Sequence, residues 1–199
     1  IALAAEAGCL FVFIGFETID RGSLRKMDKG VNLRAGIESY KATADIYHRH
    51  GIGVLGAFIL GNDFESAAYY KRLAKFLLHS RIDAFQISIL TPLPGTRLMD
   101  DQIASDNLIH GNFPEDWEKY RFSYMVHKPE GIDQETVYTG DNYIKNRLYS
   151  FPHFQYRMLR SLLGLKNIEN FMVTLKLNQA LKRSWRNSHY YGKYPKQFD

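Results

Sequence analysis

Three short segments of the chain combine residue types that could hold a charged ligand rich in hydroxyl groups. Glu17 closely follows an apolar run, and its carboxylate could accept both hydroxyls of a ribose. The ammonium of Lys29 could pair with a ligand carboxylate, and Gly61 would let the backbone approach a ligand closely. A nucleoside that carries an amino acid would satisfy all three groups, so these residues favour that class of ligand.

Each segment also has a purely structural interpretation. Glu17 could cap the helix that follows it, and Asp63 or Glu65 could cap theirs by accepting backbone N–H groups. The loop at residues 91–96 could be a stiff turn, because its prolines fix φ. Taken singly, these interpretations are preferred. A ligand site becomes the better hypothesis if the three loops lie on one rim.

The elements between these segments alternate in type, which predicts a parallel α/β sheet. Unbroken apolar runs predict strands at residues 10–14, 54–60 and 84–90, and the first is typical of a strand buried on both faces. Helical patterns between and after them cover residues 20–28, 32–50, 65–79 and 97–105. Right-handed crossovers would place all carboxyl ends of the strands on one side, where ligands of such sheets gather.

The pattern changes near residue 107. Beyond it aromatic and charged residues mix, and helices are expected near residues 134–149, 153–163 and 168–187. We therefore predict a first unit at residues 1–107 and a helical extension at residues 108–199.

Composition excludes several classes of protein and site. Of the 199 residues, 45% are hydrophobic and 24% charged, which is typical of a globular protein with a sizeable core. The sequence has no apolar run of about 18 residues, as a membrane-spanning helix needs, and no leader peptide pattern. A cytoplasmic location is expected. The single cysteine, Cys9, cannot form an internal disulfide, a zinc site or a metal cluster by itself.

Positive charge is concentrated after residue 151, where nine lysines and arginines face two acidic residues. This gives an alternative function, a non-catalytic interaction module whose tail binds RNA or an anionic surface. Lys182, Arg183 and Arg186 would neutralise phosphates, and Trp185 would stack on bases. A solvated helix face is the simpler interpretation of the same charges.

Several of these strings resemble radical S-adenosylmethionine (SAM) enzymes. Residues 4–17 are similar to the region of the fourth strand of that family's barrel, and residues 28–30 to the Asn-Lys-Gly that follows it. Residues 58–61, with Glu65, resemble the fifth strand, and residues 85–96 the sixth strand and its loop. The resemblance covers about residues 1–105. It implies the C-terminal part of a partial (β/α) TIM-like barrel.

The resemblance also implies chemistry. In the family, a CxxxCxxC loop holds a [4Fe-4S] cluster, and cleavage of SAM starts radical methylation, cyclisation or related oxidoreductive reactions. Carried over to this sequence, the SAM site comprises Gly15, Phe16, Glu17, Lys29, Gly61, Glu65, Leu90 and Thr91. The cobalamin-binding members are the most similar subgroup, including Mg-protoporphyrin IX monomethyl ester cyclase-like and hopanoid methylase-like proteins. Whether the longer protein to which this chain would belong uses cobalamin stays open.

This sequence departs from the family pattern in two places. It has no CxxxCxxC motif, so we expect a fragment that is inactive alone and needs the missing N-terminal part of the same protein as its partner. In the loop after the fifth strand, Asp63 and Phe64 replace the usual Pro-Gly. The substrate is expected to be a small molecule of unknown identity. Exposed strand edges could pair to give a homo-oligomer.

Overall fold

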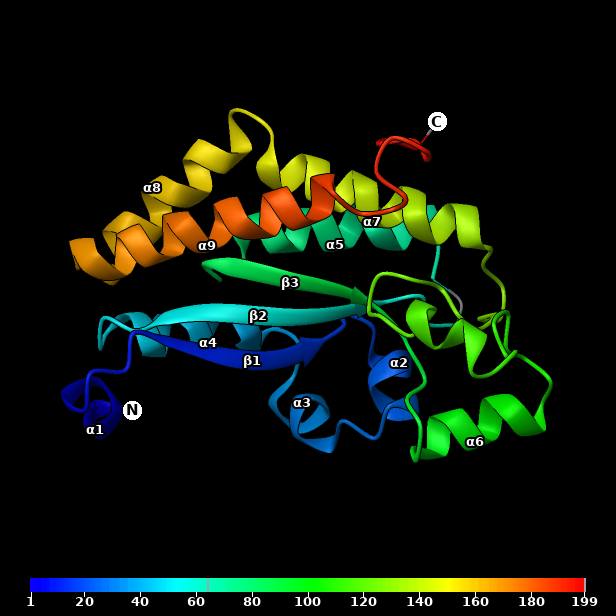
Figure 1. The fold of residues 1–199 in the computed structure, drawn as a ribbon. Coiled ribbons are helices and arrows are strands. Elements are labelled where there is room, and N and C mark those ends of the chain that lie inside the picture. Colours follow the sequence, from blue (N-terminus) through cyan, green and yellow to red (C-terminus); the bar gives the residue numbers. More distant parts are fainter. Residues whose placement is uncertain (64, 199) are drawn as a thin grey trace.

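A three-stranded parallel sheet lies at the centre of the computed structural model, which describes residues 1–63 and 65–198. The strands are β1 (Phe11–Glu17), β2 (Gly53–Leu60) and β3 (Ala84–Ile89), in the order β1-β2-β3. Their carboxyl ends lie on one side of the molecule (Figure 1). The prediction of a parallel α/β arrangement is confirmed. A closed or partial barrel stays a prediction, because three strands alone do not define one.

Helices precede, connect and follow the strands. They are α1 (Ala2–Glu6), α2 (Arg21–Lys26), α3 (Gly30–Ala35), α4 (Ser39–His48), α5 (Ala67–His79) and α6 (Arg97–Ala104). The prediction of one helix over residues 32–50 was wrong. Gly36 has a φ of 79°, which the right-handed helix excludes, and the chain turns there between α3 and α4.

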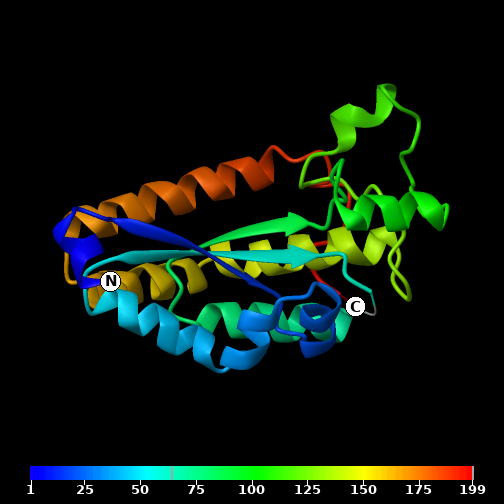
Figure 2. The same cartoon turned by 90° about the horizontal axis from the view of Figure 1, so that it is seen from below.

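One face of the sheet carries the hydrophobic core. Phe16, Phe58, Phe85 and Ile89 are buried on this face. Helices α4 and α5 lie along one side of the sheet (Figure 2). The other face is partly open, and Phe13 is 60% exposed there. Burial of residues 10–14 on both faces was therefore a wrong expectation, because β1 is an edge strand and no described helix covers its second face.

The C-terminal helices are α7 (Gln134–Tyr149), α8 (His153–Leu165) and α9 (Ile168–Arg186), close to the predicted ranges. A 3-10 helix, η1 (Glu115–Lys119), lies in the connection before them. Helix α7 packs along α5, and α9 lies along β3 (Figure 1). Val137, Ile144 and Trp185 belong to the same hydrophobic cluster as the sheet. The division at residue 107 stays a prediction.

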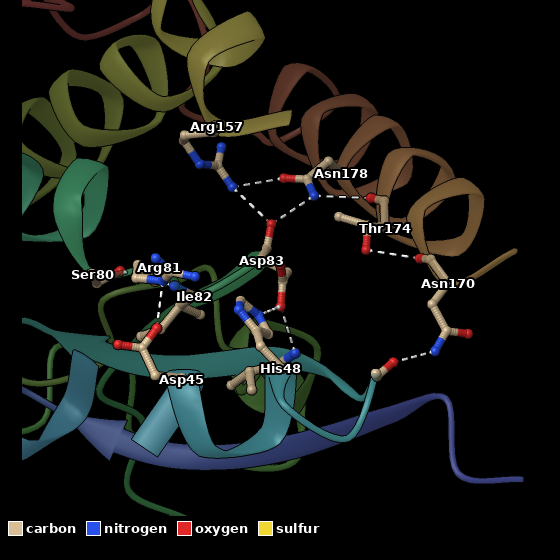
Figure 3. Close-up of polar contacts among 12 residues, drawn as sticks. Asp45, His48, Ser80, Arg81, Ile82, Asp83, Arg157, Asn170, Thr174 and Asn178 are labelled. Carbon is tan, nitrogen blue, oxygen red and sulfur yellow. Dashed lines mark hydrogen bonds and ion pairs between the residues drawn. The ribbon is translucent and has the colours of Figure 1, made fainter. Parts of the chain in front are cut away.

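A buried polar network fastens the tail helices to the amino end of β3 (Figure 3). The Arg157 guanidinium donates to the main-chain carbonyls of Asp83 and Leu148 and to Asn178 Oδ1, over 2.9–3.1 Å. Asn178 Nδ2 also donates to the Asp83 carbonyl, at 2.9 Å. Burial lowers the pKa of Arg157 to about 10. One carbonyl of the sheet thus receives hydrogen bonds from both α8 and α9.

The side chain of Asp83 extends this network to α4. Its Oδ2 lies 2.8 Å from His48 Nε2 and accepts the backbone N–H of Val54, also at 2.8 Å. On the far side, Asn170 of α9 donates to the carbonyl of Gly51, just before β2. The network is buried and lies at the end of the sheet opposite Glu17. We conclude that the network has a structural role, which is to connect the tail helices to the sheet.

None of the described helices combines the length and the apolar character that crossing a membrane requires.

Candidate functional site

Glu17 and Lys29 form the centre of the candidate site, at the carboxyl end of β1. Glu17 Oε1 lies 2.8 Å from Lys29 Nζ, and the two side chains are 10% and 44% exposed. Glu17 has a φ of 66°, an uncommon conformation for a residue other than glycine. Its carboxylate lies over Gly15, where an added Cβ would meet Glu17 Oε1 at 2.6 Å. The structure thus brings three of the predicted residues together.

Two side chains that were not among the predicted site residues hold this strand end in place. Asn32 Nδ2 donates to the carbonyls of Gly15 and Phe16, at 3.0 and 3.1 Å. The Tyr40 hydroxyl donates to the carbonyl of Phe16 at 3.0 Å and lies 3.3 Å from that of Thr18. Both residues belong to the one helix predicted over residues 32–50, and its pattern does not reveal that both side chains reach the same turn.

Glu65 organises the loop that follows β2. Its Oε2 accepts the N–H of Gly61 at 2.9 Å and the Tyr70 hydroxyl at 2.6 Å, while Oε1 accepts Asn62 Nδ2 at 2.7 Å. Gly61 has a φ of 80°, so the turn favours glycine. Burial of Glu65 raises its pKa, although the hydrogen bonds oppose this. Both oxygens are engaged within the protein, and a direct ligand contact of Glu65 stays a prediction.

The N-cap of α5 is Ser66, the residue after Glu65. Its Oγ accepts the N–H of Tyr69 at 3.3 Å. Asp63 has another role, because it pairs with Lys26 and its Oδ1 accepts the N–H of Glu130 at 2.7 Å. Burial opposes ionisation of Asp63, but the hydrogen bonds from Lys26 and Glu130 outweigh it and lower its pKa. Asp63 therefore joins the β2 loop to the segment before α7.

Leu90 and Thr91 lie at the carboxyl end of β3. The N–H of Leu90 donates to the Leu60 carbonyl at 2.8 Å, which continues the pairing with β2. Thr91 is buried, and its hydroxyl donates to the carbonyl of Ile89 at 3.0 Å. The predicted residues of β1, β2 and β3 thus occupy neighbouring strand ends on one side of the sheet. The structure shows contact within the Gly15–Glu17–Lys29 group, and contacts of the others with a ligand stay predictions.

The residues described do not offer a set of ligands for a metal cluster. Among residues 1–63 and 65–198 no group of three or more His, Cys, Asp or Glu side chains is placed to hold a metal ion. Cys9 precedes β1, at the strand end opposite Glu17, and its thiol lies 3.4 Å from the carbonyl of Phe11. One thiol does not supply the several thiolates that hold an iron–sulfur cluster.

The structure does not support the base-stacking role that the interaction-module hypothesis gives to Trp185. Trp185 is buried, and its Nε1 donates to Asn142 Oδ1 at 2.9 Å. Lys182 lies between the tail helices, where its ammonium donates to the carbonyl of Tyr149 at 3.2 Å. Arg183 and Arg186 remain exposed. The indole is therefore unavailable to a base, and phosphate contacts alone would have to carry RNA binding.

Comparison with known proteins finds methyltransferases among the relatives of this chain. Bacteriochlorophyllide d C-12(1)-methyltransferase of Chlorobaculum tepidum is 32% identical over 143 residues, 72% of this chain and 29% of that protein. Bacteriochlorophyllide d C-8(2)-methyltransferase of the same organism is 27% identical over 157 residues, 78% of this chain and 30% of that protein. Hopanoid C-2 methylase of Rhodopseudomonas palustris is 32% identical over 110 residues, 55% of this chain and 20% of that protein.

The chain is a homologue of methyltransferases. It spans less than a third of the length of these relatives. A scan against models of protein families finds no match. The methyltransferase homology supports the expected use of SAM, since the transferred methyl group needs a donor. It does not extend to a cluster, to cobalamin or to cyclase-like chemistry.

Proposed function

We propose that this chain is the SAM-binding, C-terminal part of a radical SAM methyltransferase that acts on a small molecule. The Glu17–Lys29 pair is the observation that carries the proposal, because two complementary charges meet at the carboxyl end of a parallel strand. Methylation is preferred to cyclisation, since the three relatives named above are methyltransferases or a methylase by name.

The residues of the strand ends fit the groups that SAM presents. Glu17 would accept the ribose hydroxyls, and Lys29 would pair with the carboxylate of the amino acid part. The Gly61 turn would let the backbone approach the ligand, and Leu90 and Thr91 would pack near the adenine. Bound SAM would supply the methyl group and, on receiving one electron from the cluster of the complete protein, the radical of the reaction. The chain's own part is to bind and orient SAM.

The pairing of Glu17 with Lys29 prepares both groups for this role. Each charge has a partner within the protein, so neither side chain needs to be ordered from many rotamers to bind a ligand. A zwitterionic ligand with hydroxyl groups could exchange for both partners at once. Asn32 and Tyr40 keep the strand end rigid through their bonds to the Phe16 carbonyl.

We assign the [4Fe-4S] cluster, and cobalamin if the parent uses it, to the part of the relatives' length that this chain does not match. The proposed protein is cytoplasmic, and the chain alone is inactive. Its partner is the N-terminal part of the same protein. Association through strand edges is proposed for the chain in isolation.

The coding sequence upstream of Ile1 tests the assignment directly. The proposal expects an in-frame CxxxCxxC motif there, and its absence would remove the radical SAM class. The chain alone should remain colourless after reconstitution with iron and sulfide. A stable brown chromophore on this chain would contradict the assignment of the cluster to the rest of the protein.

A further inference from the structure

A groove of about 400 Å³ lies between α5, α7 and α8. We call it the α5–α7–α8 groove. It is lined by Lys71, Ala74, Lys75, Leu78, His79, Tyr143, Arg147, His153 and Tyr156. Its volume falls within the range of about 300–1,000 Å³ that small-molecule sites occupy. The site proposed for SAM uses none of these residues.

The charge of the α5–α7–α8 groove is entirely positive. Lys71 and Lys75 follow one another at i and i+4 on α5, and Arg147 of α7 adds a third cation. Within the part of the chain that the structure describes, none of the three forms an ion pair with a carboxylate. Like charges at this spacing destabilise a helix by about 0.2–0.5 kcal/mol. An anion bound between the helices would remove that repulsion.

The remaining lining residues supply hydrogen-bond donors and a rigid wall. Tyr143 of α7 and Tyr156 of α8 also line the groove. The His79 Nδ1–H donates to the Lys75 carbonyl at 2.7 Å, which orients the imidazole ring against α5. The side chain of Arg160 donates to the carbonyls of Leu78 and His79 at 2.8 and 3.3 Å, and its guanidinium lies 5.2 Å from the ring centroid of Tyr156. The C-terminal turn of α5 is thereby held against α8.

The floor of the groove is apolar and buried, because Ala74 and Leu78 lie below the charged side chains. Lys71, Lys75 and Arg147 are themselves exposed, so an anion can reach all three from solvent. His153 also lines the groove. Its partial burial and, second, the positive charge of Arg147 lower its pKa. An imidazole in this position responds to neighbouring positive charge that no described carboxylate offsets.

We propose that the α5–α7–α8 groove binds a small phosphate-bearing anion. Three cations from two helices match the several oxygens of a phosphate, and the tyrosine hydroxyls can complete its hydrogen bonds. The groove holds more than a single phosphate group, so a diphosphate or a phosphorylated metabolite suits its size. This site is separate from the Glu17–Lys29 pair and does not depend on the function proposed for that pair.

Calorimetric titration of the chain with pyrophosphate at low salt tests the proposal. We expect saturable binding with one site, weakened at least about tenfold, or about 1.4 kcal/mol, in a Lys75→Gln/Arg147→Gln variant. The matched control is Lys41→Gln/Arg183→Gln, which removes the same charge from exposed residues outside the groove. Equal weakening in both variants, or no saturable binding to the wild type, would overturn the proposal. Unchanged thermal midpoints show that the variants fold.

Anionic macromolecules provide the second arm of the test. Sedimentation with phosphatidylglycerol vesicles and gel-shift with single-stranded RNA are measured for the same three proteins. Pyrophosphate should bind in their absence and should compete for any groove-dependent association. Groove-dependent binding to vesicles or RNA without binding of pyrophosphate would show a different ligand class and contradict the proposal.

Discussion

The carboxylate of Glu17 lies over the backbone of Gly15, where the Cβ of any other residue would come within 2.6 Å of Glu17 Oε1. This side-chain position places Oε1 2.8 Å from Lys29 Nζ. The glycine is therefore required by a side-chain contact rather than by its own φ. The charge arrangement at the end of β1 depends on a residue that itself carries no functional group.

A Gly15→Ala substitution should displace the Glu17 carboxylate. Because the atom that the new Cβ meets is the end of a flexible side chain, stability should change by less than about 1 kcal/mol. SAM binding by the complete protein, measured by equilibrium dialysis, should weaken about tenfold. Gly111→Ala is the control, since its Cβ would meet Leu108 at an ordinary 3.6 Å. Equal SAM affinity in both variants would argue against the proposed site.

Substitution of the pair itself separates binding from stability. Lys29 is 44% exposed, so Glu17→Gln or Lys29→Met should cost less than about 1 kcal/mol in unfolding free energy. Each should weaken SAM binding by the complete protein about tenfold to a hundredfold, as expected for losing a hydrogen bond to a charged group. The prediction fails if the unfolding free energy drops sharply while SAM affinity is retained.

Glu65 predicts a pH-dependent contribution to stability. Its pKa in the folded protein is raised, so the folded state binds its proton more tightly than the unfolded chain. That favourable term is present at acidic pH and is lost as the pH rises from about 4.3 through the folded pKa. The difference in unfolding free energy between wild type and Glu65→Gln should therefore shrink as the pH rises. Denaturant titrations at several pH values measure it.

The neutral variant also carries a fixed cost in stability. A glutamine offers one acceptor oxygen in place of the two that Gly61, Asn62 and Tyr70 use. Glu65→Gln should thus be less stable at acidic pH by about 1–3 kcal/mol. A stability difference that stayed constant with pH would show that the pKa of Glu65 is not raised.

Arg157→Met should destabilise the fold strongly. The substitution leaves the carbonyl of Leu148 and Asn178 Oδ1 without this donor in a buried setting, and an expected loss of about 2–4 kcal/mol follows. Arg183→Met, at an exposed position of α9, is the control and should change stability by less than about 0.5 kcal/mol. Equal unfolding free energies of the two variants in urea would contradict the assigned role of the network.

Local patterns were sufficient for much of the fold. The strands and the tail helices could be predicted because apolar periodicity is local. In the structure, Asp133 and Asn167 cap α7 and α9. The break between α3 and α4 was missed. Asn32, near the middle of α3, bonds to carbonyls at the end of β1, and nothing in the neighbouring sequence signals that contact.

Long-range contacts account for what the sequence could not predict at the site. The positions of Glu17, Lys29 and Gly61 followed from the order of strands and loops, but the contact between Glu17 and Gly15 depends on side-chain conformation. The burial of Arg157 also depends on contacts between residues that are distant in the sequence. This residue belongs to a basic tail whose charges were expected to be solvated, yet it is buried where α8 and α9 meet the sheet and donates to the carbonyl of Asp83.

The outer side of β3 is occupied at both of its ends. Arg157 and Asn178 donate to the Asp83 carbonyl just before the strand, and the Ile89 N–H at its end donates to the carbonyl of Phe122. A further strand added beside β3 would have to displace these bonds and α9. We therefore expect any additional strand, from the same protein or from a second copy, to pair with β1, the other edge strand of the sheet.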